Sequence, residues 1–458
     1  MSFTAALLLL ASLCPPATCA AVTAAFGKPV MVGSSSNTKF WFSRLGVTGH
    51  HGTVVAPAQR DGDGGGLPCR SPDGCSGKLM ATLDGGHSWQ AAGPTGLSSI
   101  NPAEGEFISL IPQTGPQANR TFLTLGYTRR MSADGRSALG GGGDAVWRDE
   151  GGGKLMHLRD INVTISGFPA PVRSLVFNPH VVTLKEGGEL LSPMYGTLRS
   201  PPLGCNAGAS GECASVFFVR SSDQGRSWTY VSRIDATPEW LPWTDSEGAC
   251  EPGLVQLPDG RLLTTFRVDA RSLLFEAFSS DDGTSWTVPR RLSAWSVMPQ
   301  LQLLSNGVLL LTSGRPGIGM WARPTAGGAA DDESWVHYDL ASEHSKQVAP
   351  QWQYTGNTLN ASCTGSLAPA ACHGRTTCTE CTPDGGGTNK TTTPPQTTAY
   401  TGMVEVEPDG ADKGESGVSV VLVVYDRIAN GWDMPPGPWG TQDAIFSMRV
   451  AFTATGSD

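Results

Sequence analysis

A carboxylate and a guanidinium flank one short stretch of the chain, Cys250 to Arg267, which reads CEPGLVQLPDGRLLTTFR. Apolar residues on either side of its Pro-Asp-Gly turn predict two short strands joined as a hairpin. Glu251 begins the first strand and Arg267 ends the second. Because antiparallel neighbours run in opposite directions, both side chains should emerge at the same rim of a sheet. There the two groups form either a plain salt bridge or part of a site that moves protons and holds anions.

The composition favours an all-β fold around this hairpin. Only 16% of the 458 residues are charged, while 58 Gly, 33 Pro and 13 Trp indicate many short strands and turns. No sustained 3.6-residue apolar period, the mark of long amphipathic helices, is present. The length allows one large β domain or two to three ordinary ones.

The first twenty residues are typical of a secretory signal peptide, with an apolar run at Ala5 to Leu13 and small residues before the expected cleavage point. No later apolar run reaches the roughly 18 to 20 residues that a membrane span needs. We therefore expect a secreted or lumenal protein, including the lysosome-like case, with residues 21–458 as the mature domain. The net charge of −9 makes nucleic acid and anionic membranes poor partners.

Cysteines and glycosylation signals agree with the secretory route. Two of the 11 cysteines lie in the first twenty residues, so the mature chain would keep nine. In a secreted protein this number predicts disulfides, and the expected pairs leave Cys250 without a disulfide partner. A zinc site at Cys378 and Cys381 is the alternative for that pair, and the secretory context disfavours it. The expected bridges are Cys69–Cys75, Cys205–Cys213 and two among Cys363, Cys372, Cys378 and Cys381. Four Asn-X-Ser/Thr acceptors are present, at Asn119, Asn162, Asn360 and Asn389.

One turn motif recurs three times, at Thr82–Trp89, Ser221–Trp228 and Ser279–Trp286, as Ser/Thr-X-Asp-X-Gly-X-Ser-Trp. In such a turn the aspartate accepts backbone N–H groups, the glycine takes a positive φ and the tryptophan packs on the sheet. We therefore interpret these aspartates as structural. A degenerate fourth copy ends at Trp335.

A second repeat, a glycine turn leading into an apolar strand, predicts six hairpins and hence six four-stranded antiparallel blades of a β-propeller. The last strand, Ala444 to Phe452, is expected to close the ring beside the first blade. Residues 357–398 are rich in Thr, Gly, Pro and Cys and predict a surface insert. The six glycine turns lie at Gly52, Gly115, Gly188, Gly260, Gly307 and Gly410.

The turn motif is the Asp-box, and with six blades the chain resembles the sialidase superfamily, glycoside hydrolases that remove terminal sialic acids. The family carries a Glu, a hairpin and then one of three arginines that hold the substrate carboxylate, and Glu251 to Arg267 is similar in order and spacing. Asp-boxes also occur in propellers that bind or scaffold, so the resemblance alone does not establish activity.

The family's nucleophile is a tyrosine that opens the final blade, and Tyr400 resembles it. The resemblance implies that Glu251 activates Tyr400 as its base; the other interpretation of Tyr400 is an ordinary rim aromatic. Tyrosine suits this chemistry because a charged carboxylate nucleophile would be repelled by the carboxylate on the anomeric carbon of sialic acid. The hairpin after Tyr400 ends in Tyr425 and Asp426, where the family usually has Glu, so Asp426 is a further substrate-binding candidate.

The remaining site residues follow from the same resemblance. Arg315, on a Gly/Pro-rich turn, and Arg44, which begins the first blade, would join Arg267 on the substrate carboxylate, since guanidiniums give paired planar hydrogen bonds. Arg60 would support the pocket, and Asp73 would be the acid/base. Asp61 and Asp63 remain alternatives for the acid/base.

The resemblance therefore implies a retaining exo-α-sialidase that acts on sialylated glycans or another acidic sugar and needs no cofactor or metal. Two other functions stay open: a catalytically weak propeller that binds acidic glycans, and a structural extracellular scaffold. Linkage preference and oligomeric state cannot be predicted from the sequence.

Overall fold

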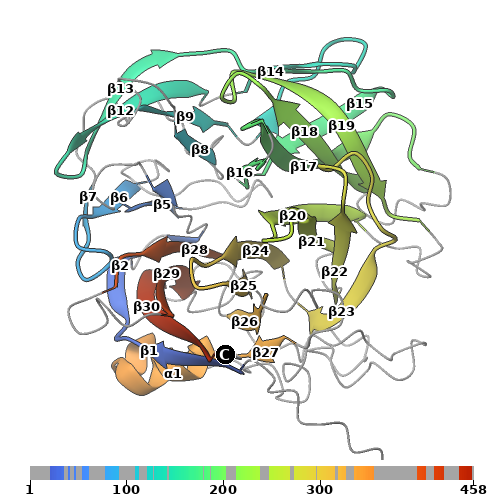
Figure 1. Ribbon diagram of the computed structural model, residues 1–458. Helices are drawn as coiled ribbons and strands as arrows, with labels where there is room; N and C mark the ends of the chain where they lie inside the picture. The colour runs from blue at the N-terminus through green and yellow to red at the C-terminus, as the bar shows by residue number, and fades with distance from the viewer. Residues whose placement is uncertain are drawn as a thin grey trace, which may run out of the picture.

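The computed structural model describes most of residues 21–455, and the strands in it follow one another around a ring (Figure 1). The residues it does not describe are 1–20, 36–39, 42–45, 48–53, 61–77, 92–108, 113–120, 127, 142–143, 179, 186, 203–212, 238–246, 269–272, 296, 315–317, 326–334, 355–399, 409–416, 428–442 and 456–458. The predicted insert at 357–398 lies outside the described residues.

The described strands form six sheets. The first two sheets contain β3 (Phe40–Trp41), β4 (Gly46–Val47), β5 (Val54–Arg60), β6 (Lys78–Thr82) and β7 (Gln90–Ala91), then β8 (Ser109–Pro112), β9 (Thr121–Leu125), β12 (Ala145–Gly151) and β13 (Lys154–Asp160). The third sheet contains β10 (Thr128–Arg129), β11 (Ala138–Leu139), β14 (Thr164–Ser166), β15 (Val172–Phe177), β16 (Val182–Thr183), β17 (Leu190–Leu198), β18 (Ala214–Ser221) and β19 (Ser227–Asp235).

The other three sheets complete the ring in Figure 1. The fourth and fifth contain β20 (Ala249–Gln256), β21 (Leu262–Val268), β22 (Leu273–Ser279) and β23 (Arg290–Trp295), then β24 (Val297–Leu303), β25 (Val308–Gly314), β26 (Gly319–Pro324) and β27 (Val336–His337). The sixth contains β28 (Thr401–Val406), β29 (Val418–Arg427), β30 (Asp443–Thr455), β1 (Ala21–Phe26) and β2 (Val30–Ser35).

The prediction of an all-β, propeller-like fold is confirmed, but the sheets are less regular than six equal four-stranded blades. Three of the six described sheets have four strands, two have five and one has eight. The eight-stranded sheet gains short strands because β14 pairs in parallel with β19 and β10 pairs with β15. Such short pairings across connections carry no periodic signal in the sequence.

The last strand, β30, lies beside β3 of the first sheet, where the ring was expected to close. The sequence did not predict how the last sheet is completed: β30 pairs with β29 on one side and with β1 and β2 on the other. The N-terminal strands thus belong to the last sheet, and Val22 packs in the same core cluster as Phe446 and Phe452. This pairing has no local signal, because Ala21 to Ser35 contains no glycine-turn hairpin and its partner lies at the other end of the chain.

The three Asp-box turns make the predicted contacts. In the first, Asp84 accepts hydrogen bonds from the Ser88 backbone N–H at 2.9 Å and from the Thr82 hydroxyl at 2.7 Å, and Gly86 N–H donates to Thr82 at 2.8 Å. The other two boxes repeat these contacts. Burial alone would raise the pKa of Asp84, but hydrogen bonds from Ser88 and Thr82 outweigh it and lower the pKa to about 2. These aspartates fold turns and are not catalytic candidates.

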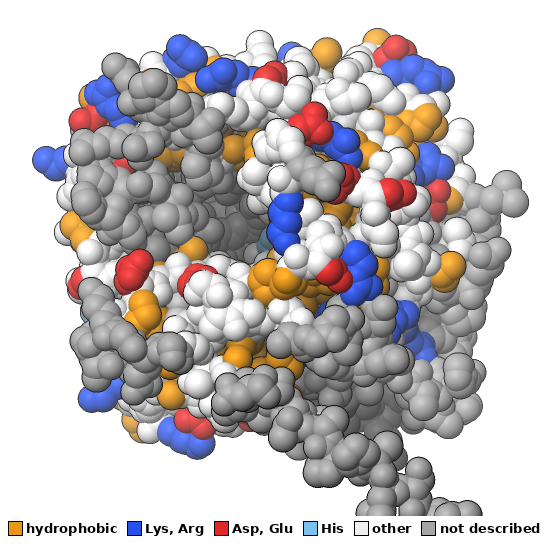
Figure 2. Space-filling view, viewed as in Figure 1, with side chains coloured by type: hydrophobic (Ala, Val, Ile, Leu, Met, Phe, Trp, Pro, Cys, Tyr) orange, Lys and Arg blue, Asp and Glu red, His pale blue; other side chains and the backbone are white. Residues whose placement is uncertain are grey.

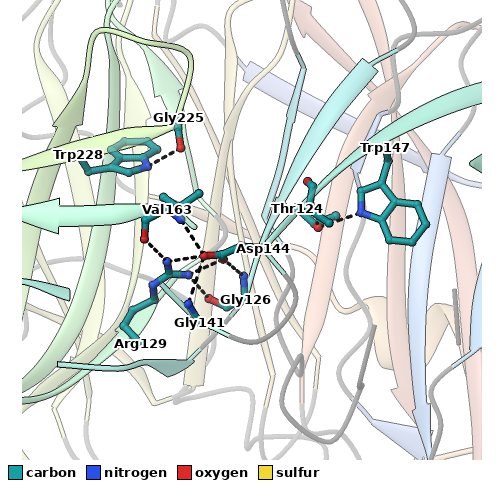
Figure 3. Close-up of polar contacts among 10 residues, drawn as sticks. Thr124, Gly126, Arg129, Gly141, Asp144, Trp147, Val163, Gly225 and Trp228 are labelled. Carbon is teal, nitrogen blue, oxygen red and sulfur yellow. Dashed lines mark hydrogen bonds and ion pairs between the residues drawn. The ribbon is translucent and has the colours of Figure 1, made fainter. Parts of the chain in front are cut away.

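A buried ion pair ties the second sheet to the third (Figure 3). Arg129 donates two hydrogen bonds to Asp144, at 2.6 and 2.7 Å, and the two side chains are 0% and 1% exposed. Asp144 also accepts from the backbone N–H groups of Gly126, Gly141 and Val163. These additional hydrogen bonds offset part of the cost of burying the two charges. We therefore interpret this pair as structural.

The described α-helix, α1 (Leu340–Gln347), covers one side of the sixth sheet (Figure 1). Asp339 caps its N-terminus by accepting from Ser342 N–H at 2.9 Å. His344, wholly buried, lies 2.9 Å from the Tyr425 hydroxyl and 3.0 Å from the Trp352 carbonyl. Because a carbonyl only accepts, Nε2 carries the proton and Nδ1 accepts from Tyr425. No helix in the described part of the chain has the length and apolarity to cross a membrane.

Burial lowers the pKa of His344 to about 4, so acid should weaken this contact. The unfolded chain binds a proton near pH 6.5 and the folded chain only near pH 4. The free energy of unfolding should therefore fall by about 3 kcal/mol from this group between those pH values. Urea unfolding of the wild type and of His344→Gln at several pH values measures it. A pH slope that is the same in both proteins would contradict this assignment.

Candidate active site

The hairpin that carries Glu251 and Arg267 forms as expected, with β20 and β21 paired and Cys250 opposite Arg267. Both charged residues are nearly buried: Glu251 as a whole is 4% exposed and Arg267 is 6% exposed. They lie at the same end of the sheet because the first strand begins where the second ends. The Pro-Asp-Gly turn lies at the other end, where Asp259 and Arg261 form a separate, more exposed ion pair.

Arg267 is held by two carboxylates. Its Nε donates to Glu251 Oε2 at 2.6 Å and its Nη2 donates to Glu251 Oε1 at 3.1 Å, which is a bidentate pair. Its Nη1 donates to Glu247 Oε2 at 2.7 Å. Glu247, which precedes β20, was not predicted as a site residue. The salt bridge that the sequence left open is therefore present, with a second carboxylate on the far side of the guanidinium.

The backbone at Glu251 adopts an unusual conformation at the point where its carboxylate leaves the strand. Glu251 has a φ of 51°, and the pairing of β20 with β21 shifts register between Cys250 and Gly253. A non-glycine residue at positive φ costs on the order of 1 kcal/mol and persists only where its surroundings enforce it. In the next sheet Met298 has the same φ of 51° at a similar register shift, and its N–H donates to Glu251 Oε2 at 3.0 Å.

Tyr400 reaches this carboxylate from the sixth sheet. Its hydroxyl lies 3.3 Å from Glu251 Oε1, although 149 residues separate the two in sequence. The contact is possible because β20 lies beside β24, and β24 beside β28, which Tyr400 precedes. This distance is longer than the usual O–H···O separation of about 2.7–2.8 Å.

Asp426, on β29, binds the backbone of Tyr400. Its Oδ1 accepts from Tyr400 N–H at 3.3 Å, and the residue is wholly buried. Thr401, next in the chain, donates to Thr312 on β25 at 3.1 Å, which fixes the start of β28 against the fifth sheet. The described contact of Asp426 is thus with backbone, and its predicted contact with substrate stays a prediction.

Electrostatics keep Arg267 charged. Burial alone would lower its pKa, but the neighbouring acidic groups Cys250, Glu251 and Glu247 outweigh burial and raise the pKa well above its ordinary value. Cys250 is a fully buried cysteine that belongs to no disulfide, in agreement with the prediction from the cysteine count. The other cysteines of the predicted bridges lie outside the described residues, apart from Cys213, so those bridges stay predictions.

Several predicted site residues cannot be placed. Arg44, Arg315 and the three acid/base candidates Asp61, Asp63 and Asp73 lie outside the described residues. Arg60 ends β5, where it pairs with Phe40, but its side chain is not described. Gly314, the residue before Arg315, pairs with Val297 directly beside Met298. Among the described residues, no three His, Cys, Asp or Glu side chains gather as a metal site requires.

Asn178 is a positioning residue that sequence reasoning missed. This wholly buried side chain follows β15, and its Nδ2 donates to the Pro252 carbonyl, directly after Glu251. The available signal was a repeated residue-proline step. Asn178, Glu251 and Met298 each precede a proline, Asn178 directly after β15 and the other two near the starts of β20 and β24. Glu251 is therefore supported from the sheets on both sides.

The face of the molecule drawn in Figure 2 is hollowed near the middle of the ring. The strands labelled β24 and β28 in Figure 1 border that hollow. A concave centre with a few convergent polar groups is where ligand sites are commonly found.

The energetic coupling between Glu251 and Arg267 can be measured without any assumption about function. Arg267→Met should lower the free energy of unfolding by about 3–5 kcal/mol, because it leaves a buried carboxylate uncompensated. The double variant Glu251→Gln/Arg267→Met should lose less than the two single variants together. Urea unfolding gives these values, and Arg148→Met, which breaks an exposed pair with Glu150, is the control with an expected loss below about 1 kcal/mol. Simple additivity would contradict the coupling.

Comparison with known proteins supports the fold. Residues 169–353 match the BNR repeat-like domain, a segment that contains Glu251 and Arg267 but not Tyr400. A search of curated protein sequences finds no match.

Solved structures resemble this one at low identity. A protein of unknown function from Dyadobacter fermentans is 15% identical over 93% of this chain and 98% of its own, with a TM-score of 0.52. An alpha-L-arabinanase from Penicillium chrysogenum is 12% identical over 92% and 98%, with a TM-score of 0.50. A leech intramolecular trans-sialidase is 14% identical over 92% and 69%, with a TM-score of 0.42. At these identities the likeness to the first two structures shows a fold in common and nothing further.

Proposed function

We propose that this protein is a retaining exo-α-sialidase on a six-bladed propeller, with Tyr400 as nucleophile and Glu251 as its base. One observation carries the proposal: Tyr400 and Glu251 come from different sheets and meet at 3.3 Å, with Arg267 on the same carboxylate. A plain rim salt bridge accounts for Glu251 and Arg267 but not for a buried tyrosine hydroxyl directed at their carboxylate.

The proposed reaction follows from these groups. Glu251 takes the phenolic proton as Tyr400 Oη attacks the anomeric carbon, and the bond to the leaving group breaks. The leaving oxygen receives a proton from the acid/base aspartate, for which Asp73 is the candidate. In the second step, water attacks the anomeric carbon from the face that the leaving group has left, and the aspartate, now ionised, takes a proton from this water. The bond between the anomeric carbon and Tyr400 Oη breaks, and Glu251 returns its proton to Tyr400, so that configuration is retained.

The substrate carboxylate would be held by arginines. Arg267 is the described candidate, and Arg44 and Arg315 are the predicted partners. Cationic groups that converge on one carboxylate in an acidic protein select an acidic sugar over a neutral one. From residues 1–20 we also propose that the protein is secreted or lumenal.

Turnover of a fluorogenic aryl α-sialoside by the purified glycosylated protein tests the activity directly. We expect release of the phenol between about pH 4 and 7, because the proposed acid is a carboxylate. An aryl α-L-arabinofuranoside is the matched neutral substrate, prompted by the arabinanase with a similar fold. Cleavage of the arabinoside alone would replace the proposal, and cleavage of neither would leave the glycan-binding alternative.

Tyr400→Phe separates catalysis from binding. The variant removes only the attacking oxygen, so kcat should fall at least about a hundredfold while the affinity for sialic acid changes little. Tyr230→Phe, which makes the same change on β19 where Tyr230 packs against Phe168, is the control and should keep full activity. Equal losses of turnover and sugar binding in Tyr400→Phe would argue against a nucleophile.

A further inference from the structure

Glu247 is the solvent-facing member of the charged trio around Arg267. Its side chain is 34% exposed, whereas those of Arg267 and Glu251 are 7% and 5% exposed. Glu251 binds Nε and Nη2 from within the protein, and Glu247 binds Nη1 from the outer side. A ligand that comes from solvent therefore meets Arg267 at the edge that Glu247 covers.

The position of Glu247 is built into the backbone. Its carbonyl accepts from Ala214 N–H at 2.9 Å, and the next residue, Gly248, bridges to Ala214 in the neighbouring sheet. Gly248 has a φ of 93°, and a Cβ there would lie 2.3 Å from the Ala214 nitrogen. Only glycine fits both constraints. Glu247 is thus fixed at the start of β20, within reach of Arg267, and is not a freely placed surface side chain.

Charge balance then sets the requirement on a ligand. In the described trio, two carboxylates surround one guanidinium, so a third carboxylate is repelled until it displaces Glu247 from Nη1. Two like charges in contact near a protein surface repel strongly. An anion that offers only one weak contact cannot replace Glu247, whereas a carboxylate fixed on a well-bound sugar can.

We infer that Glu247 determines specificity in this site: its carboxylate accepts the hydrogen bond of Arg267 Nη1 before substrate binds, and only the carboxylate of the substrate displaces it. The inference rests on the proposed function, because it assigns Arg267 to the carboxylate of an acidic sugar.

Glu247→Gln tests this inference, because it removes the charge and keeps the shape. KM for the aryl sialoside should fall about tenfold, with a smaller change in kcat, since the substrate carboxylate no longer competes with a like charge. Glu247→Ala should lower KM in the same direction. Asp259→Asn is the matched control, because Asp259 pairs with Arg261 at the opposite end of the same hairpin, and it should leave both constants unchanged. An unchanged or raised KM in Glu247→Gln would overturn the inference and show that Glu247 only orients Arg267.

Calorimetric titration with free N-acetylneuraminic acid separates this inference from the proposed function. If the wild type has no turnover but Glu247→Gln binds the acid about tenfold more tightly than the wild type does, the hydrolase proposal fails and the role of Glu247 stands. Arg267→Ala should abolish that binding in both backgrounds. If neither the wild type nor Glu247→Gln binds the acid, the inference fails as well.

Discussion

The buried ion pair between Glu251 and Arg267 is the interaction on which this end of the molecule depends. Two opposite charges that leave water lose several kcal/mol of hydration each, and the folded protein keeps them only if their remaining donors and acceptors are satisfied. The neighbouring groups do this: Met298 N–H and the Tyr400 hydroxyl complete Glu251, and Glu247 completes Arg267. The same contacts place the Tyr400 hydroxyl 3.3 Å from a carboxylate that is held on its other side by Arg267.

The ring of sheets brings these partners together. Glu251, Met298 and Tyr400 belong to the starts of β20, β24 and β28, the first strands of three consecutive sheets, and those strands lie side by side. Closure of the ring supports the sheet that carries Tyr400. Because β1 and β2 complete the sixth sheet, the strands behind Tyr400 are paired on both sides, and Asp426 is buried where it can hold the Tyr400 backbone.

Carboxylates serve two different purposes in this chain, and their surroundings decide which. The Asp-box aspartates accept hydrogen bonds from backbone and hydroxyl groups within a few residues, and those contacts fold a turn. Glu251 accepts from Arg267 across its own hairpin, and from the Met298 N–H and the Tyr400 hydroxyl, which belong to two other sheets. Residue type alone does not separate the two classes of carboxylate. They differ in how far along the sequence their hydrogen-bond partners lie.

The sequence by itself determined what depends on local contacts. The hairpin of Glu251 and Arg267, the three Asp-box turns and the all-β class could be predicted, because strand alternation, turn chemistry and four-residue hydrogen bonds are written in adjacent residues. The pairing of β30 with β1, the support of Glu251 by Asn178 and the placement of Glu247 were decided by tertiary structure alone. The contact of Tyr400 with Glu251 was implied by the family resemblance, and no local pattern indicated it. Each of these joins different sheets or a connection to a sheet, and sequence periodicity carries no information about which strand ends share a rim until the ring has closed.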